Sequence, residues 1–408
     1  MRRAVVAVLV FTACAAVPVA HAAVPLPTSD PFYAVPAGIG GLPNGTVLGS
    51  RSITAYGGPI PLPADAWEVK YKTLDTQGNP TATVATVLVP TTRWHGPGPR
   101  PLVSYQTAED GVGAKCSPSY ALHAGLAAGD SNSEAETAVI AAALLQGWAV
   151  VAPDYEGPNS DFLGAAGEAH GVLDGIRAAL AFAPAGFATG TPVALWGYSG
   201  GALASSLAAQ LQAQYAPDLR FAAVVLGGAV GDLRATLDAF NGNVYGGGVI
   251  VGLIGLDRSY PSANLDQYIS AAGLKVLAAN QTDCLSDAIA RYPFFNIDKY
   301  EAVPNAIELP AVQSLLESVS PVYFGGTPTA PVYDYHAVFD ELAPIGADRA
   351  LMHRYCAAGV PVDHYEDYLS EHISLTATGA PGAIAYLTHR FAGKPARDNC
   401  NSIPAGTP

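Results

Sequence analysis

The sequence from Pro192 to Ala209 reads PVALWGYSGGALASSLAA and decides the fold. An apolar run that suits a strand comes first, a Gly-x-Ser-x-Gly motif centred on Ser199 follows, and an alanine-rich helical run comes last. This order is typical of a nucleophile elbow, a sharp turn that presents a serine hydroxyl to solvent. Gly197 and Gly200 suit that turn, because a Cβ would clash where strand and helix approach closely. The alternative is a chance glycine-rich turn, since the chain has 43 glycines in 408 residues.

Further apolar runs predict a mainly parallel sheet around this turn. They are continuous, as expected of strands buried on both faces, and lie at 101–105, 148–152, 192–196, 221–226, 331–335 and 362–368. Helical stretches separate them, at 134–146, 167–182, 202–215 and 346–358. Two alternating, β-branched runs, 67–72 and 81–89, predict an antiparallel hairpin before the parallel strands. Strands that alternate with helices predict an α/β fold. Residues 23–63 are rich in Pro and Gly and suggest an irregular arm.

The first 22 residues have the features of a secretory signal peptide. Arg2 and Arg3 precede an apolar core and an Ala-x-Ala cleavage site at residues 20–22, so we expect an extracellular mature chain that begins near Ala23. No later apolar run is long enough to span a membrane. The net charge is −14, and an acidic chain repels phosphates and anionic surfaces. We therefore expect no nucleic-acid partner and no integral membrane segment in the mature chain.

Four cysteines remain after the expected cleavage site: Cys116, Cys284, Cys356 and Cys400. An even number in a secreted chain indicates disulfides, and four cysteines allow three connectivities. Proximity in the sequence favours Cys356–Cys400, which leaves Cys116–Cys284. A metal site is the alternative, but no Cys-x-x-Cys or Cys/His cluster supports it. We expect neither a metal nor an organic cofactor.

A serine nucleophile needs a histidine to take its proton and an acid to orient that histidine. In α/β-hydrolases the order along the chain is serine, acid, histidine, and the last two follow late strands. The loop after the strand 331–335 contains Asp340, which we choose as the acid, and Glu341, its closest alternative. A helix cap ahead of Gly346 is the other role that Asp340 could have. Asp334 lies within the strand, where we expect it to be packed or paired.

The histidine should follow the strand 362–368, and His372 is at that position. His364 lies inside the strand and is expected to be packed, and His389 on the closing helix is expected at the surface. The tetrahedral intermediate also needs two donors to its oxyanion. The backbone N–H of Gly200 is one, and the loop 106–111 should supply the other, although it lacks a His-Gly-Gly-Gly motif.

The strand that ends near Leu226 and the strand that begins near Pro331 are about a hundred residues apart, far more than a simple crossover needs. We expect a mostly helical cap at 227–329, inserted between two parts of one core at 23–226 and 330–408. Within it, the segment from Val244 to Leu256 is almost wholly apolar. A buried cap helix is the favoured interpretation, and a lid or acyl-binding wall is compatible with it.

With these motifs the chain resembles the secretory lipase family, the lipase A type of α/β-hydrolase, from near Pro31 to Gly393. The resemblance rests on Tyr105-Gln106, Glu109-Asp110, CSPSY at 116–120, VAPDYEGP at 151–158, LDGIRAA at 173–179, GYSGG at 197–201, and the positions of Cys356 and Cys400.

The resemblance implies a catalytic triad, an oxyanion hole, two disulfides and a helical cap over an acyl tunnel. The residues implied are Ser199, Asp340 and His372 for the triad, Asp110 and the Gly200 N–H for the oxyanion hole, and the bridges Cys116–Cys284 and Cys356–Cys400. An aspartate at the oxyanion hole must be protonated, or turn its backbone inward, to donate.

The motifs together predict a secreted serine carboxylester hydrolase, specifically a triacylglycerol lipase. We expect a lipid or ester substrate and transient contact with a lipid interface. A short-chain esterase, a secreted serine peptidase of the same fold and a non-catalytic homologue are the alternatives.

Overall fold

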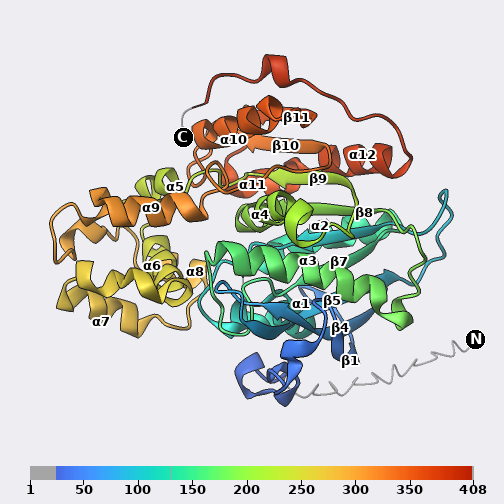
Figure 1. Ribbon diagram of the computed structural model, residues 1–408, viewed down its shortest axis with the longest axis horizontal. Helices are drawn as coiled ribbons and strands as arrows, with labels where there is room; N and C mark the ends of the chain where they lie inside the picture. Colours follow the sequence, from blue (N-terminus) through green and yellow to red (C-terminus); the bar gives the residue numbers. More distant parts are fainter. Residues whose placement is uncertain (1–23, 130, 407–408) are drawn as a thin grey trace, which may run out of the picture.

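The computed structural model describes residues 24–129 and 131–406, so the expected signal peptide lies outside the described residues. In the described part, nine strands form one sheet in the order β1-β4-β5-β7-β6-β8-β9-β10-β11 (Figure 1). They are β1 (Val47–Ile53), β4 (Ala64–Leu74), β5 (Pro80–Pro90), β6 (Leu102–Gln106), β7 (Ala149–Pro153), β8 (Val193–Tyr198), β9 (Phe221–Gly227), β10 (Val332–Ala337) and β11 (Val362–Asp367). The pairs from β1 to β7 are antiparallel, and those from β7 to β11 are parallel. The predicted α/β architecture with a mainly parallel sheet is confirmed.

Helices cover both faces of the sheet. One face carries α3 (Ala165–Ala181), α4 (Gly200–Tyr215) and α10 (Ile345–Ala357). The other carries α1 (Pro118–Ala124), α2 (Ser131–Leu145), α11 (His372–Thr378) and α12 (Ala380–Phe391). In β8, Val193 and Leu195 pack toward the first layer, and Ala194 and Trp196 pack toward the second. Because both faces of the central strands are buried, their sequences are apolar without alternation.

The N-terminal arm is more regular than its composition suggested. Residues 47–53 form β1, which pairs with β4 at the edge of the sheet, and β2 (Tyr56–Gly57) pairs with β3 (Ile60–Pro61). The expectation of an irregular arm over residues 23–63 is therefore wrong in this part. An edge strand has one neighbour and is only partly buried here, so it forms without the apolar run that marks a central strand.

The residues between β9 and β10, which we call the helical segment (228–331), contain α5 (Leu233–Phe240), α6 (Gly247–Ser259), α7 (Ala271–Ala279), α8 (Leu285–Arg291) and α9 (Pro310–Val319). These helices lie together at one side of the sheet (Figure 1). The apolar run noted in the sequence forms most of α6, which buries Val249, Ile250 and Ile254 in a small core made mainly by the segment, together with Val112. Across the described ranges, no helix combines the length and apolarity needed to cross a membrane.

Two disulfides tie distant parts of the described chain together. Cys116–Cys284 joins the region after β6 to the start of α8, and Cys356–Cys400 joins α10 to the C-terminal region. The first bridge therefore fixes the helical segment to the core at a place other than its two chain connections.

Candidate active site

Ser199 lies in the sharp turn between β8 and α4. Its backbone has φ 54° and ψ −122°, a conformation that residues other than glycine rarely adopt. A Cβ on Gly197 would come within 2.1 Å of the carbonyl oxygen of Gly201, so only glycine fits before the turn. The turn places Ser199 directly ahead of the first backbone N–H groups of α4, which have no partner inside the helix. The turn predicted around Ser199 is present.

The structure brings Ser199, His372 and Asp340 into one hydrogen-bonded chain. Nε2 of His372 lies 2.8 Å from Oγ of Ser199, and Nδ1 of His372 lies 2.7 Å from Oδ2 of Asp340. The other carboxylate oxygen of Asp340 accepts from the backbone N–H groups of Leu342 and Ala343, at 2.9 and 2.7 Å. The alternative role of Asp340 as a cap of α10 is not seen, because that helix begins after Pro344 without a side-chain cap.

The position of His372 is set by the start of α11. The carboxylate of Glu371 accepts from the N–H groups of Ile373 and Ser374 and so caps this helix, which begins at His372. The hydroxyl of Tyr198 donates to the backbone carbonyl of His372, and the N–H of His372 donates to Glu341 at 3.2 Å. Glu341, weighed above as the acid, instead contacts the backbone of His372.

The pKa shifts of the site favour an ionised Asp340 and a His372 that readily accepts a proton. Burial alone would lower the pKa of His372, but the adjacent Asp340 raises this pKa above its ordinary value. Burial raises the pKa of Asp340, yet the neighbouring His372 outweighs burial and brings the pKa below its ordinary value. Asp340 is therefore ionised at neutral pH and stabilises a protonated His372.

Asp110 lies in the loop after β6, with φ 31°, and its side chain points at Gly200. A Cβ on Gly200 would lie only 1.7 Å from Oδ1 of Asp110, so this contact also requires glycine. Buried carboxyl groups surround the loop. Burial, reinforced by the charge of Asp110, raises the pKa of Glu168 to about 8, and burial beside Glu109 raises that of Glu156. Glu156 and Glu168 therefore favour their protonated forms near neutral pH.

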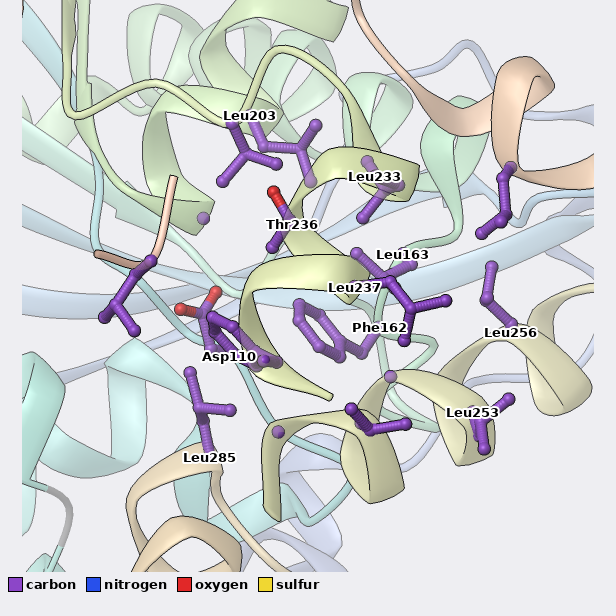
Figure 2. Close-up of a pocket in the computed structure, with 18 of the residues that line it drawn as sticks. Asp110, Phe162, Leu163, Leu203, Leu233, Thr236, Leu237, Leu253, Leu256 and Leu285 are labelled. Atoms are coloured by element: carbon purple, nitrogen blue, oxygen red, sulfur yellow. The ribbon is translucent and has the colours of Figure 1, made fainter. Parts of the chain in front are cut away.

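A cavity of about 130 Å³ opens from Ser199 and Asp110 into the helical segment (Figure 2). Asp110, Ser199 and Thr236 are the polar side chains that line it, and nearly all the others are apolar. Most of the wall comes from the helical segment: Val230, Leu233, Leu237, Phe240, Val249, Leu253, Leu256, Leu265, Leu285, Ile307, Val312, Leu315 and Leu316. The core contributes Phe162, Leu163 and Leu203. The arrangement suits a long apolar group with a carbonyl at Ser199.

The remaining candidates lie elsewhere. His364 is buried and its Nδ1 lies 2.6 Å from Oδ2 of Asp334, in line with the packed or paired roles expected of both. His389 is exposed on α12. The contacts that Tyr198 and Glu341 make with the backbone of His372 were not anticipated, and only the nearness of Tyr198 to the elbow and of Glu341 to Asp340 signals them.

Comparison with known proteins gives a consistent result. The family model described as secretory lipase matches residues 123–399. A protein of Mycobacterium tuberculosis named a probable inactive lipase is 39% identical over 380 residues, which is 92% of this chain and 84% of that protein. Lipase A of Arthroderma benhamiae is 35% identical over 92% of this chain and 82% of its own length. The crystal structure of Candida antarctica lipase A in its closed state superposes with a TM-score of 0.86 at 29% identity, covering 95% of this chain and 91% of that one.

Proposed function

Because the chain belongs to the secretory lipase family of α/β-hydrolases, we propose that it is a secreted serine carboxylester hydrolase that acts as a triacylglycerol lipase. One observation carries the proposal: the hydrogen-bonded chain of Ser199, His372 and Asp340 opens onto an apolar cavity that extends into the helical segment. The first feature suits nucleophilic attack on a carbonyl group, and the second suits a fatty acyl chain.

In the proposed reaction, Oγ of Ser199 attacks the ester carbonyl carbon while Nε2 of His372 takes the hydroxyl proton. Asp340 stabilises the imidazolium that forms. When the tetrahedral intermediate collapses, the C–O bond to the alcohol breaks and His372 gives its proton to the leaving alcohol. The acyl group is then bonded to Ser199. Water attacks this ester with His372 as base, the fatty acid leaves, and the proton returns to Ser199.

The negative charge that develops on the carbonyl oxygen needs donors beside Ser199. The backbone N–H of Gly200, at the start of α4, supports one such role, because it is an unshared donor at the positive end of a helix. Asp110 lies against Gly200 and is the proposed second donor, through a protonated carboxyl group.

A non-catalytic homologue is the second candidate, since a similar mycobacterial protein is named a probable inactive lipase. The spacing of the three groups argues against inactivity here, because both contacts of His372 are within ordinary hydrogen-bond distance. The apolar cavity also argues against a serine peptidase and against a short-chain esterase. A peptide would leave its many polar groups unpaired on an apolar wall, and a short acyl group would leave the apolar side chains far from Ser199 without a contact.

We also propose that the helical segment acts as a cap that provides the acyl-binding wall, and that the protein is extracellular. The disulfides support the second point, because such bridges persist in oxidising compartments. The N-terminal sequence with the features of a signal peptide supports it as well.

Labelling with a fluorophosphonate probe tests the proposal most directly. The wild type and the control variant Ser314→Ala, an exposed serine of α9, should both be labelled and should hydrolyse p-nitrophenyl esters. Ser199→Ala should be neither labelled nor active. Wild-type protein that is folded but not labelled would establish the non-catalytic alternative. A peptide anilide offered to the same preparation separates amide from ester cleavage.

A further inference from the structure

A second cluster of imidazole and carboxylate groups lies buried within the core, apart from Ser199. Asp334 in β10 and His364 in β11 are direct partners across the parallel pair of strands, and Asp348 approaches them from the first turn of α10. Asp334 and Asp348 are fully buried, and His364 is 7% exposed. One donor atom from each of the three lies within 4.8 Å of the other two.

The hydrogen bonds of His364 direct one nitrogen into this cluster. Its Nε2 lies 3.2 Å from Oε1 of Glu366, and Glu366 is itself held by Nε of Arg349 at 2.7 Å. Its Nδ1 donates a hydrogen bond of 2.6 Å to Oδ2 of Asp334 and lies 3.9 Å from Oδ2 of Asp348, so a bound ion would take the place of the Nδ1 proton. A histidine that ligates a metal typically donates its other N–H to a carboxylate in this way, which fixes the tautomer and the ring.

His336 repeats this arrangement on the other side of Asp348. Its Nε2 lies 2.8 Å from the backbone carbonyl of Ala343, to which it can only donate, so in the neutral ring Nδ1 carries a lone pair. That Nδ1 lies 3.6 Å from Oδ1 of Asp348 and has no hydrogen-bond partner among the described residues. With a neutral ring and an ionised carboxylate, two acceptors face each other in the core, and either a proton on one of them or a cation near both would stabilise the contact.

Asp348 faces Asp334, with which it can share a proton, and the rings of His336 and His364. In the described chain, neither of its oxygens accepts a hydrogen bond, and one oxygen of Asp334 also accepts none. An isolated buried carboxylate is costly unless it is paired or bound to a metal. When both carboxylates are ionised they carry two negative charges, which a divalent cation would neutralise.

We propose that Asp334, Asp348 and His364 form a binding site for a divalent transition-metal ion, with Zn²⁺ as the best chemical match. Imidazole and carboxylate donors together suit Zn²⁺, whereas Ca²⁺ takes six to eight oxygen ligands, more than this site offers. The ion joins α10 to β10 and β11 and has a structural role. His336 lies between this site and Asp340, 3.4 Å from Oδ2 of the latter, so the site also supports the loop that carries the proposed catalytic acid.

The metal content of the purified protein tests this proposal without any assay of hydrolysis. The protein is produced without a polyhistidine tag, in minimal medium supplemented with ZnCl₂ or CoCl₂, because a buried site is filled most readily during folding. Elemental analysis should find about one equivalent of metal per chain, and the cobalt form should show visible d–d absorption. X-ray absorption at the zinc edge should show N/O ligands at about 2.0–2.1 Å with imidazole scattering.

Asp348→Asn should reduce the bound metal to about a tenth of an equivalent or less, because it removes a charged ligand. Asp363→Asn is the matched control, since this residue adjoins His364 but points to the opposite face of β11. Stoichiometric metal in Asp348→Asn overturns the proposal. If Asp348→Asn does not fold, the metal content and the X-ray absorption of the wild-type protein test the proposal instead. Wild-type protein without metal, or with metal but no imidazole scattering, overturns the proposal, and a proton shared by Asp334 and Asp348 then holds the cluster.

Discussion

The backbone carbonyl of Asp110 accepts a hydrogen bond of 2.8 Å from the backbone N–H of Leu285, the first residue of α8. The neighbouring residues strengthen this contact, because Gly111 forms a β-bridge with Cys284, and Cys284 is bonded to Cys116. The loop proposed to stabilise the oxyanion is thus held by the helical segment as well as by the core. The position of Asp110 beside Ser199 depends on a part of the chain more than 170 residues further on.

Removing the Cys116–Cys284 bridge should reduce kcat more than removing the Cys356–Cys400 bridge. Each bridge restricts the unfolded chain and stabilises the fold by about 4–5 kcal/mol at most in the chain-entropy model, so either paired Cys→Ser variant should lower Tm. Only the first bridge lies beside the Asp110 loop. Ester hydrolysis well below both melting temperatures checks this, and equal losses of kcat would show that the bridge does not position the loop.

Asp110→Asn should keep most of the activity, whereas Asp110→Ala should lose about 10²–10³ in kcat, the usual cost of a missing oxyanion donor. The amide of asparagine has the shape of the carboxyl group and donates without needing a proton. Asparagine also tolerates the positive φ at this position. Kinetics with a p-nitrophenyl ester measure both values. Full activity in the alanine variant would assign the second donor to a backbone N–H instead.

The pH dependence of kcat/KM should report the protonation of His372. Attack by Ser199 requires the neutral imidazole, so activity should rise with pH through the pKa of this histidine. Because Asp340 raises that pKa, the midpoint of the acid limb should lie above the ordinary histidine value of 6.5. A midpoint at or below this value would contradict the pairing of His372 with Asp340.

Substitution of the two neighbouring acids separates their roles. Asp340→Asn should shift the acid limb to lower pH and reduce kcat by about 10⁴, because the imidazolium loses its partner. Glu341→Gln should shift the limb in the same direction but less, since Glu341 has a smaller influence on the pKa of His372. A severe loss of kcat in Glu341→Gln, with activity kept in Asp340→Asn, would exchange the two assignments.

A bulky residue at position 252 should shorten the preferred acyl chain. Gly252 lies in α6 and lines the cavity, and a Cβ there meets only Leu163, at 3.8 Å. Gly252→Leu should therefore lower kcat/KM for long-chain p-nitrophenyl esters at least about tenfold, with little effect on acetate or butyrate esters. Gly252→Ala is the control, because it changes helix propensity with little added volume. An unchanged chain-length profile in Gly252→Leu would place the acyl group elsewhere.

The local pattern of the sequence predicts the central sheet and the turn at Ser199 well. Continuous apolar runs mark strands that are covered on both faces, and the elbow depends on neighbouring residues that the sequence shows directly. The order of the strands then indicates the loops that hold Asp340 and His372. By contrast, β1 escapes prediction because an edge strand needs no apolar run.

The cluster of Asp334, Asp348 and His364 could not be predicted from the sequence, for a different reason. Its members lie 14 and 16 residues apart, on two strands and a helix, and no periodicity links them. Only the parallel register of β10 and β11 places Asp334 opposite His364. Register between strands joined by a crossover depends on packing of the whole sheet, so contacts of this kind become visible only in the structure.

The Cys116–Cys284 bridge gives the helical segment a third attachment, besides its entry after β9 and its exit into β10. With these two chain connections alone, the segment could rotate as a unit about them. With the third, such a rotation would pull the Asp110 loop along with it. A movement of the helical segment that widened the entrance would therefore also displace Asp110, the proposed oxyanion donor, and the return movement would restore its position beside Ser199.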